Sequence, residues 1–341
     1  MQMAKILVTG GCGYIGSHTI IDLLSNGFEV VSIDNNIRSK ASAVDLIFDI
    51  TAKRVKNYVI DLCDKELTRK VFLENKFDAV IHFAALKSVP ESVENPLLYY
   101  RNNLDSLLNL LELSAEFAIK NFVFSSSCSV YGNTTQLPVT EETPFGNAES
   151  PYARSKQMSE EIIQDFSKTS SAKFILLRYF NPVGAHESGK LGEDSTDVIT
   201  AMVPRITGTA IGKFKDFTVF GNNYDTRDGS CIRDYIHVMD IASAHTKAVE
   251  YLNKQSDQGQ TEVFNLGTGN GVTVLEAIKS FEKVTGEKLN YKLGERRDGD
   301  VVSIYANNNK AVSKLNWNIK RDLDTMMLTA WVWEKNLAGK S

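Results

Sequence analysis

The sequence has little of the material from which several classes of protein are built. Its cysteines, Cys12, Cys63, Cys128 and Cys231, are widely spaced and form no CxxC pair, so we expect neither a disulfide scaffold nor a metal site. No apolar run reaches the roughly 18–20 residues that cross a bilayer. The N-terminus lacks the apolar core of a signal peptide. These features together predict a cytoplasmic protein with reduced thiols and no membrane contact.

An excess of positive charge is missing as well. The 341 residues carry a formal net charge of −4, and the sequence pI is about 5.8, so no basic field is available to hold a nucleic acid. The composition, with 43% hydrophobic and 23% charged residues, is that of an ordinary globular protein. The length corresponds to about two domains.

Short apolar runs alternate with amphipathic stretches in the first half of the chain. The pattern predicts helices at 14–25, 106–118 and 159–166 and strands at 6–8, 28–33, 58–60, 79–83, 122–124 and 174–177. Alternating strands and helices are typical of βαβ units. We therefore predict an α/β fold, a doubly wound parallel sheet with helices on both faces.

After about Asn181 the alternation becomes irregular. We expect a helix near 201–211, a strand at 217–220, a helix at 239–253 and a strand at 263–266 that rejoins the sheet. The predicted dinucleotide-binding domain is 1–181 plus about 236–268. About 182–235 plus 269–341 are predicted to form a smaller, mixed α/β C-terminal domain that binds substrate.

A glycine-rich loop follows the first predicted strand. Gly10, Gly13 and Gly16 form a GxxGxxG pattern that opens the first helix. Glycines at this position let the backbone approach a pyrophosphate, which the helix N-terminus then binds, as in Rossmann-type folds. Asp34, at the end of the second strand, is placed to bind the adenosine ribose and to repel a 2′-phosphate, which favours NAD over NADP. Asp34 could instead cap a turn, and Asp61 could face the adenine or cap a helix.

A tyrosine and a lysine lie one helical turn apart after the fifth strand. Ser150 and Pro151 mark a helix start, so Tyr152 and Lys156 occupy positions i and i+4 on one face. A nearby ammonium and a positively charged nicotinamide would lower the pKa of the phenol and suit it to proton transfer. Ser127, at the carboxyl end of the fifth strand, could hydrogen-bond the substrate oxygen beside Tyr152.

Longer motifs extend these observations over nearly the whole chain. They are TGGCGYIGSH at 9–18, IDN at 33–35, HFAALKSVPES at 82–92, FSSSCSVYG at 124–132, SPYARSK at 150–156, LRYFNPVGAH at 177–186, RDYIHVMD at 233–240, FNLGTG at 264–269 and RRDGD at 296–300. In these motifs the sequence resembles the nucleotide-sugar branch of the extended short-chain dehydrogenase/reductase family, and within it the UDP-hexose 4-epimerases. The resemblance implies one tightly held NAD that takes a hydride from C4 of the sugar. The 4-keto sugar then rotates and is reduced again on its other face.

The resemblance also implies roles for individual residues. Ser127, Tyr152 and Lys156 would be catalytic, with Ser127 and Tyr152 at the sugar's 4-hydroxyl. NAD would lie against Gly10, Gly13, Tyr14, Ile15, Gly16, Asp34, Asn35, Asp61, Leu62, Phe83, Ala84, Lys87, Asn102, Tyr152, Lys156 and Phe180. The UDP-sugar would be held by Asn181, Phe220, Arg233, Tyr235, Arg297 and Asp300, with Ile304 as a wall beside the sugar. A homodimer in contact through 95–118 and 151–168 is a further expectation from the family.

The sequence departs from the family pattern at informative places. Residues 200–204 (TAMVP) stand where the family often shows Asn-Asn-Leu before a proline, so one polar contact to the nucleotide-sugar is either lost or supplied elsewhere. Ile304 is intermediate in size, so we expect UDP-glucose and UDP-galactose to be preferred over their N-acetylated counterparts. Residues 127–129 (SCS) contain no acid, which argues against the dehydration of related enzymes. The alternatives are a UDP-N-acetylhexosamine 4-epimerase and, more remotely, a non-catalytic NAD-sensing protein.

Overall fold

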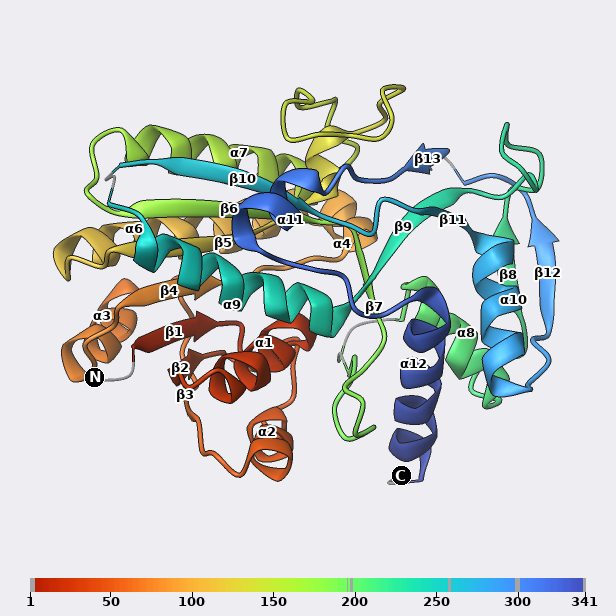
Figure 1. Cartoon of the computed structure of the whole chain (residues 1–341), viewed down its shortest axis with the longest axis horizontal. Coiled ribbons are helices and arrows are strands. Elements are labelled where there is room, and N and C mark those ends of the chain that lie inside the picture. The colour runs from red at the N-terminus through yellow and green to blue at the C-terminus, as the bar shows by residue number, and fades with distance from the viewer. Residues whose placement is uncertain (1–3, 195, 197–198, 257–258, 298–300, 340–341) are drawn as a thin grey trace.

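The protein is built on a seven-stranded parallel sheet, shown by a computed structural model that describes residues 4–194, 196, 199–256, 259–297 and 301–339 (Figure 1). The strands of the sheet lie in the order β10-β6-β5-β4-β1-β2-β3. Their bounds are β1 Lys5–Thr9, β2 Glu29–Ile33, β3 Lys56–Tyr58, β4 Ala79–His82, β5 Asn121–Ser127, β6 Lys173–Tyr179 and β10 Thr261–Leu266. The order reverses between β1 and β4, so the carboxyl ends of these strands flank the crevice where such sheets bind ligands.

Helices cover both faces of the sheet, as the alternation of the sequence predicts. One face buries α1 Tyr14–Ser25, α2 Ala43–Thr51, α9 Val238–Lys254 and α11 Asn309–Leu315. The other face buries α3 Lys65–Glu74, α6 Ser106–Glu116 and α7 Pro151–Ser167. Because both faces are covered, the central strands are continuous apolar runs such as Ile6-Leu7-Val8, all fully buried.

A second group of elements lies beyond the carboxyl edge of the sheet, on the right in Figure 1. It contains β7 Asn181–Val183, β9 Ile232–His237, β11 Gly271–Thr273 and β13 Ser303–Ile304 in one sheet and β8 Phe217–Phe220 with β12 Tyr291–Gly294 in another. The helices are α8 Met202–Ala210, α10 Val274–Thr285 and α12 Leu323–Ala338. Their shared core includes Phe281 and Trp331. This is the smaller mixed α/β part that the sequence predicts.

Most predicted elements are present, including β10, which rejoins the large sheet by pairing with β6. The strand predicted at 58–60 is displaced: β3 ends at Tyr58, where its carbonyl accepts from the Asp34 backbone N–H. In the sequence, the β-branched Val59 has the character of a residue in a buried strand. In the structure its side chain is 66% exposed. In the described residues, no helix combines the length and apolarity that a membrane crossing requires.

Candidate active site

A cavity of about 780 Å³ begins at the carboxyl edge of the large sheet and continues to β8 and β9. Its volume falls in the range of small-molecule and cofactor sites. Every described residue of the predicted cofactor set lines it, and so do Ser127, Asn181, Phe220, Arg233, Tyr235 and Arg297.

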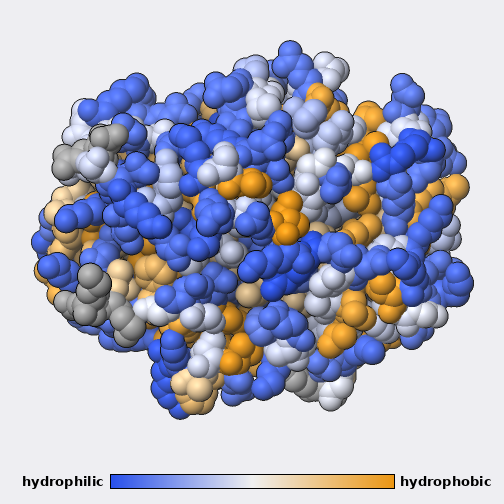
Figure 2. Space-filling view, viewed as in Figure 1, coloured by the Kyte–Doolittle hydropathy of each residue, from blue (hydrophilic) through white to orange (hydrophobic). Residues whose placement is uncertain are grey.

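On the face shown in Figure 2 the surface is mostly hydrophilic, with apolar side chains in small separate groups.

The glycine loop forms one wall of this cavity. Gly10 has φ +71°, and a Cβ there would lie 2.8 Å from the backbone nitrogen of Ala84. A Cβ on Gly16 would lie 2.2 Å from the Gly10 carbonyl oxygen, so both positions require glycine. Helix α1 begins after Gly13 with no side-chain cap and no acid in its first turn. Its N-terminus therefore suits an anionic pyrophosphate.

Asp34 lies at the end of β2 and lines the cavity, as predicted. Its Oδ2 accepts a hydrogen bond from the Cys12 N–H at 2.9 Å, and its Oδ1 accepts from the Asn36 N–H at 2.9 Å. The turn-capping role that the sequence left open is therefore present. Capping also fixes the carboxylate at the cavity wall. Asp61 likewise lines the cavity while accepting from the Cys63 N–H at 2.9 Å.

Tyr152 and Lys156 both line the cavity from the first turns of α7. The helix begins as predicted: Ser150 Oγ accepts from the Ala153 N–H at 3.1 Å, and Pro151 is the first helical residue. Burial raises the pKa of Tyr152 to about 12, and the neighbouring Ser127 hydroxyl opposes that rise. Burial lowers the pKa of Lys156 to about 8. The sequence predicts that the lysine and the nicotinamide together lower the pKa of the phenol. In the protein without NAD, burial is the largest effect on the pKa of Tyr152, and it raises that pKa.

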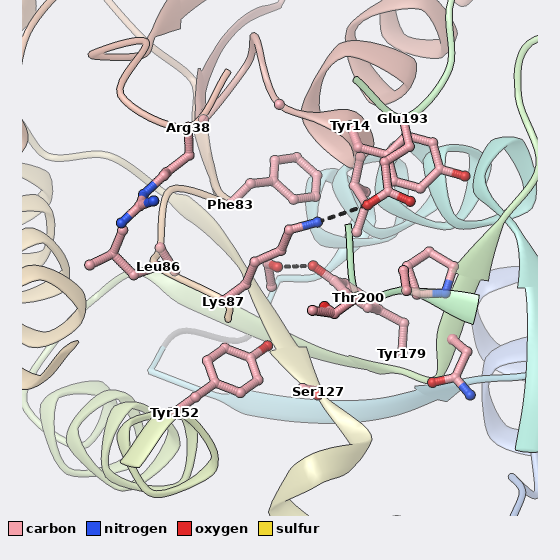
Figure 3. A pocket seen from close by; sticks show the side chains of 18 of the residues that line it. Tyr14, Arg38, Phe83, Leu86, Lys87, Ser127, Tyr152, Tyr179, Glu193 and Thr200 are labelled. Atoms are coloured by element: carbon pink, nitrogen blue, oxygen red, sulfur yellow. Dashed lines mark hydrogen bonds and ion pairs between the residues drawn. The ribbon is translucent and has the colours of Figure 1, made fainter. Parts of the chain in front are cut away.

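Three consecutive serines end β5, and each has a different environment. Ser127 Oγ caps the short 3-10 turn Cys128–Tyr131 by accepting from the Ser129 N–H at 3.2 Å. Ser125 Oγ pairs with the hydroxyl of Tyr179, and Ser126 Oγ donates to Glu160. Figure 3 shows Ser127 and Tyr152 on the same side of the pocket. Among the three serines, Ser127 is the one beside Tyr152.

A buried ion pair behind this edge was not anticipated from the sequence. Glu160 lies one turn after Lys156 on α7 and receives the Arg178 guanidinium, with Nη2 at 2.6 Å from Oε2. The side chains are 0% and 4% exposed, respectively. Arg178 also donates to the hydroxyl of Tyr131 at 3.0 Å. The pair locks α7 to β5 and β6, so it fixes the helix that carries Tyr152 and Lys156.

The loop after β4 is held in place from two directions. Residues 101–105 form a π-helical turn, a feature common at functional sites. Within it, Asn103 accepts from the Leu86 N–H at 2.8 Å and donates to the Leu86 carbonyl at 3.0 Å. Lys87 pairs with Glu193 at 3.1 Å across the pocket (Figure 3). Glu193 follows a glycine-rich, irregular segment that has no helical or strand periodicity, so the sequence does not predict it as a residue of the site.

The far end of the cavity is lined by arginines and aromatic rings. The Arg297 guanidinium lies 4.5 Å above the Phe220 ring centroid, a cation–π arrangement that orients the guanidinium. Arg233 lines the same end from β9, and Tyr235 donates to the sulfur of Met202 at 3.0 Å. Two guanidinium groups at one end of an apolar cavity suit a diphosphate.

Among the described substrate residues that the sequence predicts, Ile304 does not line the cavity. Ile304 is 6% exposed and packs with Val130, Tyr131, Val139, Phe180 and Ala306. It belongs to β13, which pairs with β9, and it is not among the residues that line the cavity. Phe180 of the same cluster does line the cavity, and the role of Ile304 as a wall beside the sugar stays a prediction. Asp300 lies outside the described residues.

Taken together, the glycine loop, the acid after β2 and the Tyr–Lys pair on α7 define a dinucleotide-binding protein of the extended short-chain dehydrogenase/reductase class. The family described as GDP-mannose 4,6 dehydratase matches residues 7–329. The chain is 46% identical over 333 residues to the UDP-glucose 4-epimerase of Haemophilus influenzae, covering 97% of each chain. It is 45% identical to that of Bacillus subtilis, again over 97% of each. The chain therefore belongs to the UDP-glucose 4-epimerase family.

Solved structures agree with this placement. The UDP-glucose 4-epimerase of Bifidobacterium longum, in complex with NAD+ and UDP, has a TM-score of 0.94 at 43% identity and covers 99% of this chain and 100% of its own. The enzyme of Stenotrophomonas maltophila, with bound NAD and formylated UDP-arabinopyranose, has a TM-score of 0.96 at 38% identity, with all of both chains covered.

Proposed function

We propose that this protein is an NAD-dependent isomerase that interconverts UDP-glucose and UDP-galactose by inverting C4 of the sugar. The observation that carries the proposal is the continuity of one cavity from the glycine loop, past Ser127, Tyr152 and Lys156, to Arg233 and Arg297. Such a cavity accommodates a dinucleotide and a nucleoside diphosphate sugar, with the reacting carbon beside the tyrosine. The relatives named above support the same reaction.

The residues of the chain divide the chemistry between them. NAD, when bound, supplies the hydride acceptor and donor. Tyr152 takes the proton from the 4-hydroxyl of the sugar and later returns it, and Ser127 hydrogen-bonds the same oxygen. The Lys156 ammonium lies one turn away on α7, tied to the carbonyl oxygen of Ser125 at 2.7 Å, and holds a positive charge near the phenol. No acid follows Ser127 in the segment 127–129, which disfavours elimination of water.

Each of the two groups of elements is proposed to bind one of the two ligands. Residues 1–181 with about 236–268 bind NAD. The remaining segments bind the UDP portion through Phe220, Arg233, Tyr235 and Arg297, together with Asn181 at the end of the first segment. Arg233 and Arg297 would hold the diphosphate, and Phe220 would pack against the base. This arrangement anchors the nucleotide while leaving the sugar free to turn, as inversion at C4 requires.

The test is direct. Unfolding the purified protein should release NAD, and the native protein should convert UDP-galactose to UDP-glucose. Release of NAD without any conversion would favour a binding protein over an enzyme. Formation of a 4-keto-6-deoxy sugar in place of UDP-glucose would instead indicate a dehydratase.

We also propose that the protein is a cytoplasmic homodimer. All four cysteines are free thiols, as in a reducing compartment. Apolar side chains are exposed on α4 Val89–Glu94 and α5 Pro96–Tyr100, with Val93 61% and Leu97 73% exposed. Both helices pack against α7, so a second copy could cover one continuous face. A Val93→Glu/Leu97→Glu variant should be monomeric by light scattering, whereas Leu73→Glu on α3, also exposed, should not change the mass.

A further inference from the structure

The segment 189–194, between β7 and α8, is held against helix α12 through its backbone. The side-chain amide of Asn336 donates a hydrogen bond to the Gly189 carbonyl at 2.8 Å. The indole N–H of Trp333 donates to the Glu193 carbonyl at 3.1 Å. Both donors belong to α12, so the segment is fixed on the smaller group of elements.

The last two side chains of this segment reach the dinucleotide-binding part. Glu193 Oε1 lies 3.1 Å from the Nζ of Lys87, in the loop after β4. Asp194 Oδ1 lies 2.7 Å from the Nζ of Lys40, in the loop after β2. Figure 3 shows the Lys87 and Glu193 side chains pointing toward one another. Two ion pairs therefore join a segment that is fixed on α12 to two loops of the other group of elements.

Both carboxylates lie beside the glycine loop. Glu193 and Asp194 line the large cavity, and Asp194 also lines a second cavity of about 20 Å³ together with Gly13 and Tyr14. Burial, followed by the nearby charge of Glu193, raises the pKa of Tyr14 well above its usual value. Tyr14 is the first residue of α1, and the N-terminus of this helix is where the pyrophosphate of NAD is proposed to lie. The two ion pairs are therefore close to the proposed position of the middle of the dinucleotide.

We propose that Glu193 and Asp194 are cofactor-retaining residues: their two ion pairs keep the 189–194 segment closed over bound NAD and slow its release. Each pair also neutralises its carboxylate, which would otherwise repel the pyrophosphate. The inference rests on the proposed function and on the placement of NAD in this cavity.

The proposed reaction gives a chemical reason for such retention. The hydride that NAD takes from C4 of the sugar must be returned by the same molecule of cofactor. NADH that left between the two steps would leave a 4-keto sugar with no reductant. A segment that slows release of the dinucleotide therefore protects the second half of the reaction.

The test measures the exchange of bound NAD. Purified holoenzyme is mixed with an excess of isotope-labelled NAD at a temperature where the wild type exchanges measurably, and the labelled share of the bound cofactor is followed by mass spectrometry. Glu193→Gln and Asp194→Asn each remove one charge and keep the side-chain shape, so each should speed exchange by up to roughly fivefold, the scale of one partly exposed ion pair. Because both pairs hold the same segment, the double variant should exchange faster than either single variant. A double variant that exchanges NAD no faster than the wild type would overturn the proposal.

Salt supplies a readout that a simple loss of packing would not move. Salt screens the charges of partly exposed side chains, so raising NaCl from about 0.05 M to about 0.5 M should speed exchange more in the wild type than in the double variant. Equal effects of salt on the two proteins would show that the ion pairs do not retain NAD.

The chain offers a matched control elsewhere on its surface. Glu262, on β10, pairs with Lys314 at 2.6 Å, and the two side chains are 20% and 49% exposed, against 26% and 49% for Asp194 and Lys40. Glu262 is not among the residues that line the large cavity. Glu262→Gln should therefore leave NAD exchange at the wild-type rate. Equal acceleration by Glu262→Gln and Asp194→Asn would overturn the proposal in favour of a general loss of stability.

Exchanging the charges of one pair tests the contact itself and does not depend on any change at Glu193. Lys40→Asp should speed exchange, and Lys40→Asp/Asp194→Lys, which restores opposite charges, should slow it again toward the wild-type rate. A double variant that exchanges as fast as Lys40→Asp would contradict retention by this pair. A wild-type protein that holds no NAD would instead contradict the proposed function.

Discussion

The Nζ atom of Lys156 lies 2.7 Å from the backbone carbonyl oxygen of Ser125. This contact ties α7 to the carboxyl end of β5, so it fixes the distance between the Tyr–Lys pair and Ser127. It also places an ammonium group, 5% exposed, against a neutral acceptor and the Phe124 ring, 4.7 Å from its centroid. Burial consequently lowers the pKa of the lysine to about 8 and raises that of Tyr152 to about 12. The chain alone thus keeps the phenol protonated, and the positive charge of bound, oxidised NAD is what would favour its deprotonation.

Tyr152→Phe should remove most turnover and leave the fold intact. The change deletes the proton-transferring hydroxyl alone, and general acid–base groups contribute about 10²–10⁴-fold to rate. Conversion of UDP-galactose and NAD content are measured on the same preparation. Tyr291→Phe, an exposed tyrosine on β12, is the matched control and should behave as wild type. More than a tenth of the wild-type rate in Tyr152→Phe would exclude the tyrosine as the base.

Lys156→Met should lose NAD retention and yet gain stability. Below pH 8 the folded protein carries a buried ammonium whose pKa is lowered from 10.5 to about 8, which costs up to about 3 kcal/mol at about 1.4 kcal/mol per pH unit. Methionine removes that cost, although it also loses the bond to Ser125. Thermal melting at pH 7 should show a higher Tm for the variant.

The pH dependence checks the same assignment. The folded protein releases the Lys156 proton first, so wild-type stability should rise between pH 8 and 10.5 relative to the variant, and the difference in Tm should shrink. A constant difference across this window would show that Lys156 is not the group responsible.

The sequence predicts the site well where a local spacing encodes it. The glycine loop, Asp34 after β2 and the i, i+4 spacing of Tyr152 and Lys156 are local patterns, and each predicts a cavity wall. The Glu160–Arg178 pair is not local. A glutamate in a polar helical stretch is ordinarily solvated, and its burial depends on β6, which is distant in sequence. The packing of Ile304 is not local either, since the two-residue strand β13 pairs with β9, which is distant in sequence.

Removing one partner of the Glu160–Arg178 pair should destabilise the protein by about 3–5 kcal/mol, because a buried charge is left unpaired. Arg178→Met and Glu160→Gln are compared with the double variant Glu160→Leu/Arg178→Met by denaturant unfolding. The double variant should be more stable than the sum of the two losses predicts. Asp165→Asn, which breaks the exposed pair with Lys168, should change stability by less than about 1 kcal/mol. Additive losses in the double variant would contradict coupling between Glu160 and Arg178.

Acid should destabilise the fold through its buried histidines. Burial lowers the pKa of four of them from 6.5, to about 4 for His18 and His245 and to about 3 for His82 and His237. Between pH 6.5 and 4 the unfolded chain binds protons that the folded chain does not, so stability falls as the pH falls. His82→Asn keeps a partner for the Thr9 hydroxyl and should reduce the slope by up to about 1.4 kcal/mol per pH unit. An unchanged slope would mean that His82 is protonated in the folded state.

Ile304 provides a test of the cavity boundary itself. A wall residue beside the sugar would change substrate preference when it is shortened, whereas a core residue would change stability. Since Ile304 packs against Phe180 and Tyr131 in a buried cluster, Ile304→Ser should cost about 2–5 kcal/mol, the range of large-to-small core substitutions. The ratio of activities on UDP-N-acetylglucosamine and UDP-glucose should stay constant. Met202→Ala, which enlarges the described cavity directly, should raise that ratio with a smaller loss of stability. If Ile304→Ser raises the ratio as much as Met202→Ala does, then the sugar reaches beyond Phe180, and Ile304 belongs to the pocket wall after all.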